Sequence, residues 1–267
     1  MACAACGLGS GQARSPGTKI FKGDIVAGGA GKQFREINFY LISSTKKKRC
    51  ILKNEEFNFF GLGIAPQIIE TLTRLQFKNP TPIQHKAIPL ALEGKDLIGV
   101  AQTGTGKTMA FGIPTLQQLA KTRARALILV PTRELALQVQ ESLAKIIQVL
   151  NMKSAVLIGG DPIYRQVQAL SKNPRILIAT PGRLIDLVQQ RKVRLKEVGI
   201  LILDEADRML DMGFAPQIET ILQEIPADRQ TLLFSATMPA AIVKMAAVHM
   251  RYPVQVEIAP PGTAAEK

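Results

Sequence analysis

Short apolar runs alternate with segments of helical periodicity over most of the chain. The apolar runs predict buried β-strands at 96–100, 126–130, 155–158, 176–179, 198–203, 231–234 and 254–258. The segments between and before them place apolar residues at helical spacing and predict helices at 64–75, 81–92, 107–121 and 133–150. Further helices are predicted to begin at 163, 181 and 239, and the segment after the strand 198–203 is predicted to be helical as far as about 224. Nearly continuous apolar strands that alternate with helices are typical of a parallel sheet covered on both faces. The pattern therefore predicts one doubly wound α/β domain over about 59–258.

The first 58 residues lack this alternation. They are rich in small residues and glycine, 34–42 could form a strand, and 46–49 is a run of three lysines and an arginine. We expect 1–58 to be a basic, poorly ordered extension. A tether for nucleic acid and an artefact of cloning or gene prediction are the alternatives.

Composition narrows the class of protein. The formal net charge of +13 and the pI of about 9.9 point to a polyanionic partner. Apolar runs stay far below the ~18 residues that a membrane span needs, and the first residues lack the apolar segment of a signal peptide. Three cysteines, Cys3, Cys6 and Cys50, make a disulfide framework improbable and favour a reducing, cytoplasmic setting. Cys3 and Cys6 have the spacing of zinc ligands, but His85 and His249 alone could complete the set with Cys50, so we do not expect a metal there.

The segment 101–108, Ala-Gln-Thr-Gly-Thr-Gly-Lys-Thr, joins a predicted strand to a predicted helix. Glycines in such a turn let backbone N–H groups surround an anion at a helix N-terminus. In a phosphate-binding loop Lys107 reaches the β- and γ-phosphates, and the Thr108 hydroxyl binds magnesium. The other predicted nucleotide-binding residues are Thr103, Gly104, Thr105 and Gly106. Alanine replaces the usual first glycine of the motif, and an ordinary Gly/Thr-rich turn is the alternative interpretation.

An acidic pair, Asp204 and Glu205, follows the predicted strand 198–203. At the carboxyl end of a buried strand, Asp204 is placed to hold Mg²⁺ and Glu205 to orient the attacking water. Acidic side chains in the first turn of a helix also interact favourably with the helix dipole. For either residue alone, this purely structural role is the alternative to a catalytic one.

Together these motifs resemble the first RecA-like domain of the DEAD-box RNA helicases, over about 59–258. Asp204-Glu205-Ala206-Asp207 spells the family name, and 77–84 (Phe-Lys-Asn-Pro-Thr-Pro-Ile-Gln) resembles the adenine-reading Q motif. The resemblance implies a RecA-like, P-loop NTPase fold and ATP with Mg²⁺ as cofactors. It implies that Gln84 pairs with adenine, that Phe77 stacks nearby, and that the upstream Phe59 supports the motif. It further implies that Asp207 acts with Ser235 and Thr237 to couple nucleotide state to strand separation.

Three further segments resemble the RNA-facing motifs of the same family, at 131–136, 159–160 and 180–183. Each follows a predicted strand, so all should gather at the edge of the sheet that holds the phosphate loop. The predicted RNA-binding residues are Pro131, Thr132, Arg133, Gly159, Gly160, Thr180, Gly182 and Arg183. Hydroxyls, helix-start N–H groups and guanidinium groups suit a sugar–phosphate backbone, so we expect RNA binding without sequence preference. Ordinary helix capping is the alternative for each segment alone.

Members of this family have two RecA-like domains, with ATP and RNA between them. Residues 259–267 resemble the start of the linker between those domains, and we expect this chain alone to be weakly active or inactive. Two functions stay open: the ATP-binding half of an ATP-dependent RNA helicase, or a non-catalytic module that binds ATP and RNA. A DNA helicase or another P-loop ATPase fits the Q motif and the acidic string less well.

Overall fold

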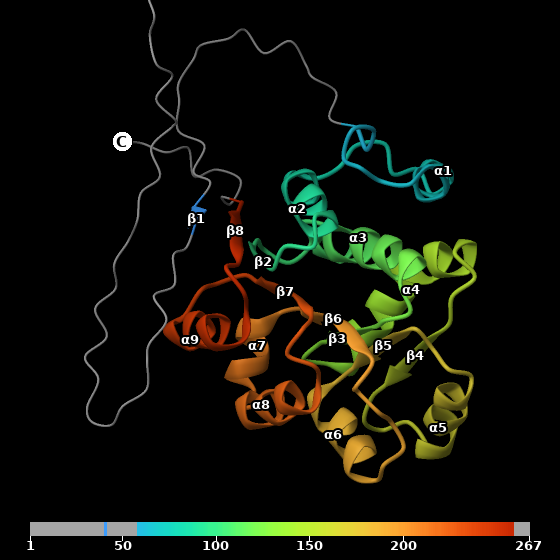
Figure 1. Ribbon diagram of the computed structural model, residues 1–267, viewed down its shortest axis with the longest axis vertical. Helices are drawn as coiled ribbons and strands as arrows, with labels where there is room; N and C mark the ends of the chain where they lie inside the picture. Colours follow the sequence, from blue (N-terminus) through green and yellow to red (C-terminus); the bar gives the residue numbers. More distant parts are fainter. Residues whose placement is uncertain (1–39, 42–57, 259–267) are drawn as a thin grey trace, which may run out of the picture.

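The computed structural model describes residues 40–41 and 58–258, which form a parallel sheet with helices on both faces (Figure 1). In this part of the chain the strands are β1 (Tyr40–Leu41), β2 (Leu97–Val100), β3 (Arg125–Leu129), β4 (Ser154–Leu157), β5 (Ile176–Ala179), β6 (Val198–Leu203), β7 (Gln230–Ser235) and β8 (Val254–Glu257). The helices are α1 (Pro66–Arg74), α2 (Pro82–Leu92), α3 (Lys107–Lys121), α4 (Arg133–Val149), α5 (Ile163–Ser171), α6 (Pro181–Gln189), α7 (Ala206–Asp211), α8 (Ala215–Glu224) and α9 (Ala240–His249).

The strands lie side by side in the order β1-β8-β2-β7-β6-β3-β5-β4, and all of these neighbours pair in parallel. Successive residues of a strand point to opposite faces of the sheet, so each strand contributes to two cores. Leu97 joins the apolar cluster that includes residues of α1 to α4, whereas Ile98 joins the cluster that includes residues of α6 to α9. Both faces are therefore buried, as the unbroken apolar runs of the sequence require.

The functional motifs all follow the carboxyl ends of strands. The phosphate loop follows β2, the acidic string follows β6, and the Ser-Ala-Thr segment begins with the last residue of β7. The three segments predicted to face RNA follow β3, β4 and β5. Because parallel strands end at the same edge, six loops that are far apart in sequence meet along one side of the domain (Figure 1).

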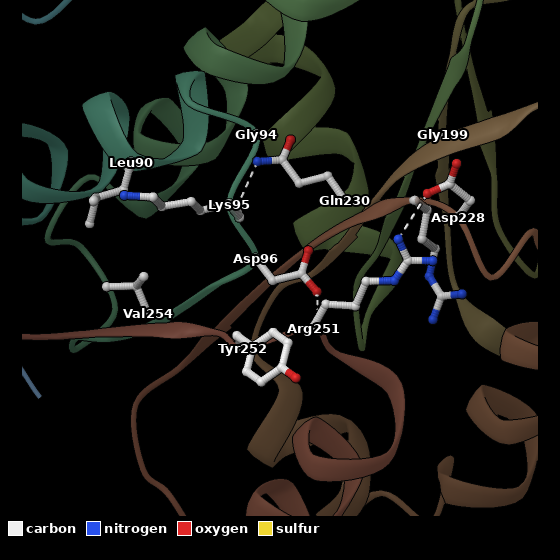
Figure 2. A pocket seen from close by; sticks show the side chains of 11 residues that line it. Leu90, Gly94, Lys95, Asp96, Gly199, Asp228, Gln230, Arg251, Tyr252 and Val254 are labelled. Carbon is white, nitrogen blue, oxygen red and sulfur yellow. Dashed lines mark hydrogen bonds and ion pairs between the residues drawn. The ribbon is translucent and has the colours of Figure 1, made fainter. Parts of the chain in front are cut away.

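A cavity of about 810 Å³ lies at the amino ends of the strands, on the side of the sheet opposite the motifs (Figure 2). Its polar side chains hold the strands together. Asp96 lies there and accepts hydrogen bonds from the backbone N–H groups of Thr231 at 2.7 Å and Arg251 at 2.6 Å. Gln230 donates to the carbonyls of Ala91 and Lys95 at 2.9 and 2.8 Å. Burial raises the pKa of Asp96, and the two backbone hydrogen bonds lower it only in part. These side chains fasten β2, β7 and the start of β8 together, away from the sequence motifs.

The predicted fold class is confirmed, and the strands predicted from residue 96 onward are present with ends shifted by about one residue. The helical segment up to 224 is divided into α7 and α8 at Gly213, whose φ is 80°. Within the strand expected at 34–42, Tyr40–Leu41 form β1, which pairs with Val254 and Gln255 of β8. The remainder of that strand, the basic run, the three cysteines and 259–267 lie outside the described residues. None of the described helices combines the length and apolar character needed to cross a bilayer.

Candidate nucleotide and nucleic-acid site

The phosphate loop lies between β2 and α3 and closes around its own lysine. Gly104 and Gly106 have φ angles of 84° and 91°, which glycine adopts without steric strain. The Lys107 side chain begins α3, is only 5% exposed, and donates a hydrogen bond from Nζ to the Ala101 carbonyl at 3.1 Å. The ammonium has two further N–H donors, and a nucleotide phosphate would compete with this carbonyl for the group.

The Q segment is fastened to the phosphate loop through Gln84. Its Oε1 accepts from the Thr81 backbone N–H at 3.0 Å, and its Nε2 donates to the Gly106 carbonyl at 3.0 Å. A Cβ at Gly106 would lie 2.4 Å from that Nε2. Both this close contact and the positive φ of residue 106 therefore favour glycine at this position. Phe77 is 37% exposed and open to a ligand, whereas Phe59 is 3% exposed and belongs to the core. Adenine reading by Gln84 stays a prediction, because both ends of the amide already have partners here.

The acidic pair lies at the end of β6 beside the phosphate loop. Asp204 is buried, and its Oδ1 accepts from the Glu205 backbone N–H at 3.0 Å. Glu205 has a φ of 52°, a left-handed conformation that costs energy for a residue with a Cβ. Its carboxylate accepts from the Thr103 hydroxyl and from the Arg208 guanidinium, both at 3.2 Å. Thr103 therefore joins the phosphate loop directly to the carboxylate predicted to orient water.

The carboxyl of Asp204 has a raised pKa. Burial raises the pKa of its carboxyl to about 6; the Lys107 ammonium lowers it in part, while the nearby carboxylates of Glu205 and Asp207 raise it. A divalent cation at this carboxyl would favour the ionised form, since a cation is the strongest local charge in such a site.

Asp207 connects the end of β6 to the end of β7. Its Oδ2 accepts three hydrogen bonds, from the Ala236 N–H at 3.2 Å and from the N–H and hydroxyl of Thr237, both at 2.9 Å. The Asp207 N–H in turn donates to the Ser235 hydroxyl at 3.3 Å. Burial raises the pKa of Asp207, but the hydrogen bonds from Thr237 and Ser235 outweigh it, so the net pKa is below the ordinary value. The three residues predicted to couple nucleotide and RNA thus contact one another.

The loops predicted to face RNA meet in a groove of about 510 Å³. It is lined by Pro131, Thr132, Arg133, Glu134, Gly159, Thr180, Gly182, Arg183, Asp186, Met212 and Phe214. Seven of the eight predicted RNA-binding residues are in this lining, and the eighth, Gly160, lies directly under Arg133. The structure therefore brings the three segments together as the topology predicted.

The two arginines of this groove are held by the loop after β4. A Cβ at Gly160 would lie 1.8 Å from Nη1 of Arg133, so the guanidinium rests against this glycine. Arg183 donates to the Asp161 carbonyl at 3.0 Å, and its buried Nε has no hydrogen-bond partner among the described residues. Thr132 Oγ1 accepts from the Leu135 N–H at 3.2 Å, so this hydroxyl caps α4 as the structural alternative proposed.

Several residues of the site escaped prediction. Met212, which is 48% exposed, and Phe214 line the groove from the turn between α7 and α8. Arg208 contacts Glu205, and Asp161 contacts both groove arginines. The apolar Met212 and Phe214 beside Gly213 were the available signal, but periodicity alone assigns such residues to a core.

Comparisons with known proteins agree with this geometry. The model of the DEAD/DEAH box helicase family matches residues 81–245. The ATP-dependent RNA helicase CshA of Listeria monocytogenes is 49% identical over 202 residues, which are 75% of this chain and 39% of that protein. The ATP-dependent rRNA helicase RRP3 of Mycosarcoma maydis is 46% identical over 76% of this chain and 37% of its own length.

Solved structures give the same result. A DEAD box protein from Methanococcus jannaschii superimposes with a TM-score of 0.72 at 40% identity, covering 75% of this chain and 55% of that one. The yeast DEAD-box splicing factor Prp28 superimposes with a TM-score of 0.72 at 36% identity, covering 76% of this chain and 51% of that one. The fold and the arrangement of its loops define a P-loop protein with a RecA-like domain. The chain belongs to the DEAD/DEAH box helicase family and spans about two-fifths of the length of the curated relatives described above.

The donor set fits a magnesium nucleotide. Lys107 is a buried cation at the phosphate loop, and Asp204 is a buried carboxylate that attracts a cation. The described residues do not bring three acidic, histidine or cysteine side chains together, so a metal here would take its other ligands from phosphate and water.

Proposed function

We propose that this chain is the ATP- and RNA-binding first RecA-like domain of an ATP-dependent RNA helicase. The observation that carries the proposal is the placement of the motifs at the carboxyl ends of adjacent strands, with hydrogen bonds that join the loops after β2, β6 and β7. Thr103 of the phosphate loop bonds to Glu205, the next acid Asp207 bonds to Thr237, and the groove follows on β3, β5 and β4. Such a path gives nucleotide and nucleic acid a shared set of loops.

The roles of the side chains follow from their chemistry. Lys107 neutralises phosphate charge, and Glu205 holds the attacking water once the Thr103 and Arg208 contacts are exchanged. Thr108 and Asp204 would hold Mg²⁺, which supplies charge neutralisation at the phosphates when it is bound. Gln84 and Phe77 select adenine, by an amide pair and by stacking.

RNA is bound through its sugar–phosphate backbone. The groove offers the guanidinium groups of Arg133 and Arg183, the half-buried backbone of Gly159 and Gly182, and the hydroxyl of Thr180. Phosphate contacts position a protein without reading sequence, so unrelated single strands should bind about equally. Contacts to the 2′-hydroxyl would favour RNA over DNA.

A second RecA-like domain completes the catalytic site in this proposal. An arginine that stabilises charge on the transferred phosphoryl group contributes about 10³–10⁵ in rate. Arg133 and Arg183 are engaged at the groove and do not supply it. We therefore expect the chain alone to bind nucleotide and RNA but to hydrolyse ATP slowly and to leave duplexes paired.

Steady-state ATP hydrolysis at saturating RNA tests this proposal, first with the chain alone and then with the second domain of a relative added in trans. Stimulation only in the second case supports it. Rapid ATP hydrolysis by the chain alone would disprove the proposal that a second domain completes the catalytic site. If nucleotide and RNA bind but no partner domain restores turnover, the alternative function, a non-catalytic binding module, is correct. Stimulation by DNA as strong as that by RNA would point to a different class of P-loop ATPase.

A further inference from the structure

Asp161 places a carboxylate at the arginines of the groove. It follows Gly160 and precedes α5, and its Oδ1 lies 3.8 Å from Nη2 of Arg133. Both side chains are about half exposed, at 51% and 48%. Its own carbonyl accepts the hydrogen bond from Arg183. A negative charge thus lies beside the groove, whose own lining includes two further acidic residues, Glu134 and Asp186.

This carboxylate is not what fixes Arg133 in place. At 3.8 Å it is an ion pair without a hydrogen bond, and pairs this exposed to water are weak. Gly160 leaves the space that the guanidinium occupies, because any Cβ there would overlap it. Arg183 is bound by the Asp161 backbone, which a change of side chain leaves intact. The carboxylate therefore acts on the groove mainly through its charge.

We propose that Asp161 is an internal competitor for the RNA phosphate at Arg133. In the free protein its carboxylate neutralises the guanidinium, and an incoming phosphate must displace it. The proposal rests on the RNA binding proposed above and adds a regulation of that site. It also explains why Asp161 has no hydrogen bond to Arg133: a weak partner is readily displaced, whereas a strong one would close the site.

The isosteric variant Asp161→Asn tests this inference, because it removes the charge and keeps the size of the side chain and the backbone carbonyl. Binding of fluorescently labelled single-stranded RNA to the full chain is measured by anisotropy at several salt concentrations. We expect Asp161→Asn to bind about two- to fivefold more tightly at low salt, the size of an exposed ion pair. The slope of log K against log salt should steepen by up to about 0.7, the value for one phosphate on a single strand.

Two controls separate this role from general charge effects and from structure. Asp228→Asn removes the same charge from a residue that is 95% exposed at the opposite edge of the sheet, and should change RNA affinity far less. In an Arg133→Ala background the gain from Asp161→Asn should shrink, because there is no guanidinium left to release. Equal thermal midpoints for parent and Asp161→Asn show that the fold is unchanged.

The outcomes are distinct. Equal or weaker RNA binding by Asp161→Asn, with the parent binding normally, overturns the inference and leaves the proposed function intact. A gain that is just as large without Arg133 also overturns it, since the effect would then be repulsion of RNA in general. Absence of RNA binding by parent and variant alike would refute the proposed function and, with it, this role for Asp161.

Discussion

Asp204 provides a quantitative test of the electrostatics of the nucleotide site. Its carboxyl has an ordinary pKa of 3.8 in the unfolded chain and a pKa raised to about 6 in the folded one, because it is buried. A difference of about 2 corresponds to about 3 kcal/mol of differential stability between its two protonation states. The folded state therefore favours the proton, so the stability associated with this group is largest below pH 3.8 and is lost as the pH rises through about 6.

The perturbation is Asp204→Asn, which removes the titration and leaves an oxygen to accept from the Glu205 N–H. The amide introduces a constant cost or gain, so the informative quantity is how the stability gap between variant and parent changes with pH. Taken as the stability of the variant minus that of the parent, this gap should be lower at pH 5 than at pH 8 by about 1–2 kcal/mol, roughly half of its electrostatic part. For a domain of this size, that is about 2–8 °C in the difference between thermal midpoints.

The assay is thermal or urea unfolding at pH 5, 6, 7 and 8, without nucleotide and with a chelator present. Asp211→Asn is the matched control, because it makes the same substitution at an exposed residue, at the end of α7. If the gap for Asp204→Asn is constant between pH 5 and pH 8, the carboxyl titrates normally and the burial argument is wrong. A gap that widens toward acid would mean that the carboxylate is stabilised in the fold.

Three further predictions concern ligand binding. Gln84→Ala should lower the ratio of ATP to GTP affinity, because it removes the amide assigned to adenine; an unchanged ratio in a competition assay would contradict that assignment. Arg183→Ala should weaken unrelated single-stranded RNAs about equally and reduce the salt slope, as anisotropy titrations can show, whereas a loss limited to one sequence would argue against backbone binding. Gly160→Ala should cost about 1–2 kcal/mol for its positive φ and weaken RNA binding by displacing Arg133. Gly94→Ala is its control in the same unfolding and RNA-binding experiments, because Gly94 also has a φ of 79° but its added Cβ meets nothing within 4 Å and lies away from the groove. Equal effects of the two variants on RNA binding would rule out this contact.

The fold was predictable because its signal is local. Runs such as 198–203 contain no polar side chain, which is typical of a strand buried on both faces, and the helical segments between them are typical of parallel crossovers. The site motifs could then be placed on one edge from topology alone. The two-residue pairing of β1 with β8 was less accessible, because it joins segments that are distant in sequence and lies within a stretch without clear periodicity.

The details of the site depend on contacts that no periodicity encodes. Nothing in the sequence around Glu205 announces its left-handed backbone, since glutamate is not a residue that favours it. The contact of Arg133 with Gly160 and Asp161 joins loops after different strands and depends on side-chain direction. Exposure is equally hidden: Phe59 and Phe77 both belong to the Q region, yet one is buried and the other open.

The hydrogen bond between Lys107 and the Ala101 carbonyl has a kinetic consequence. A nucleotide meeting the free domain finds one of the three ammonium donors engaged, so the phosphate competes with this carbonyl for Lys107, before or after encounter. If opening of the loop precedes capture, the observed association rate will level off at high ATP concentration, at the rate of loop rearrangement rather than of diffusion. The apparent affinity for nucleotide is also reduced, in proportion to the fraction of molecules whose loop is open. The same carbonyl is available to the ammonium again when a nucleotide leaves, so this hydrogen bond stabilises the free state of the loop relative to the bound one.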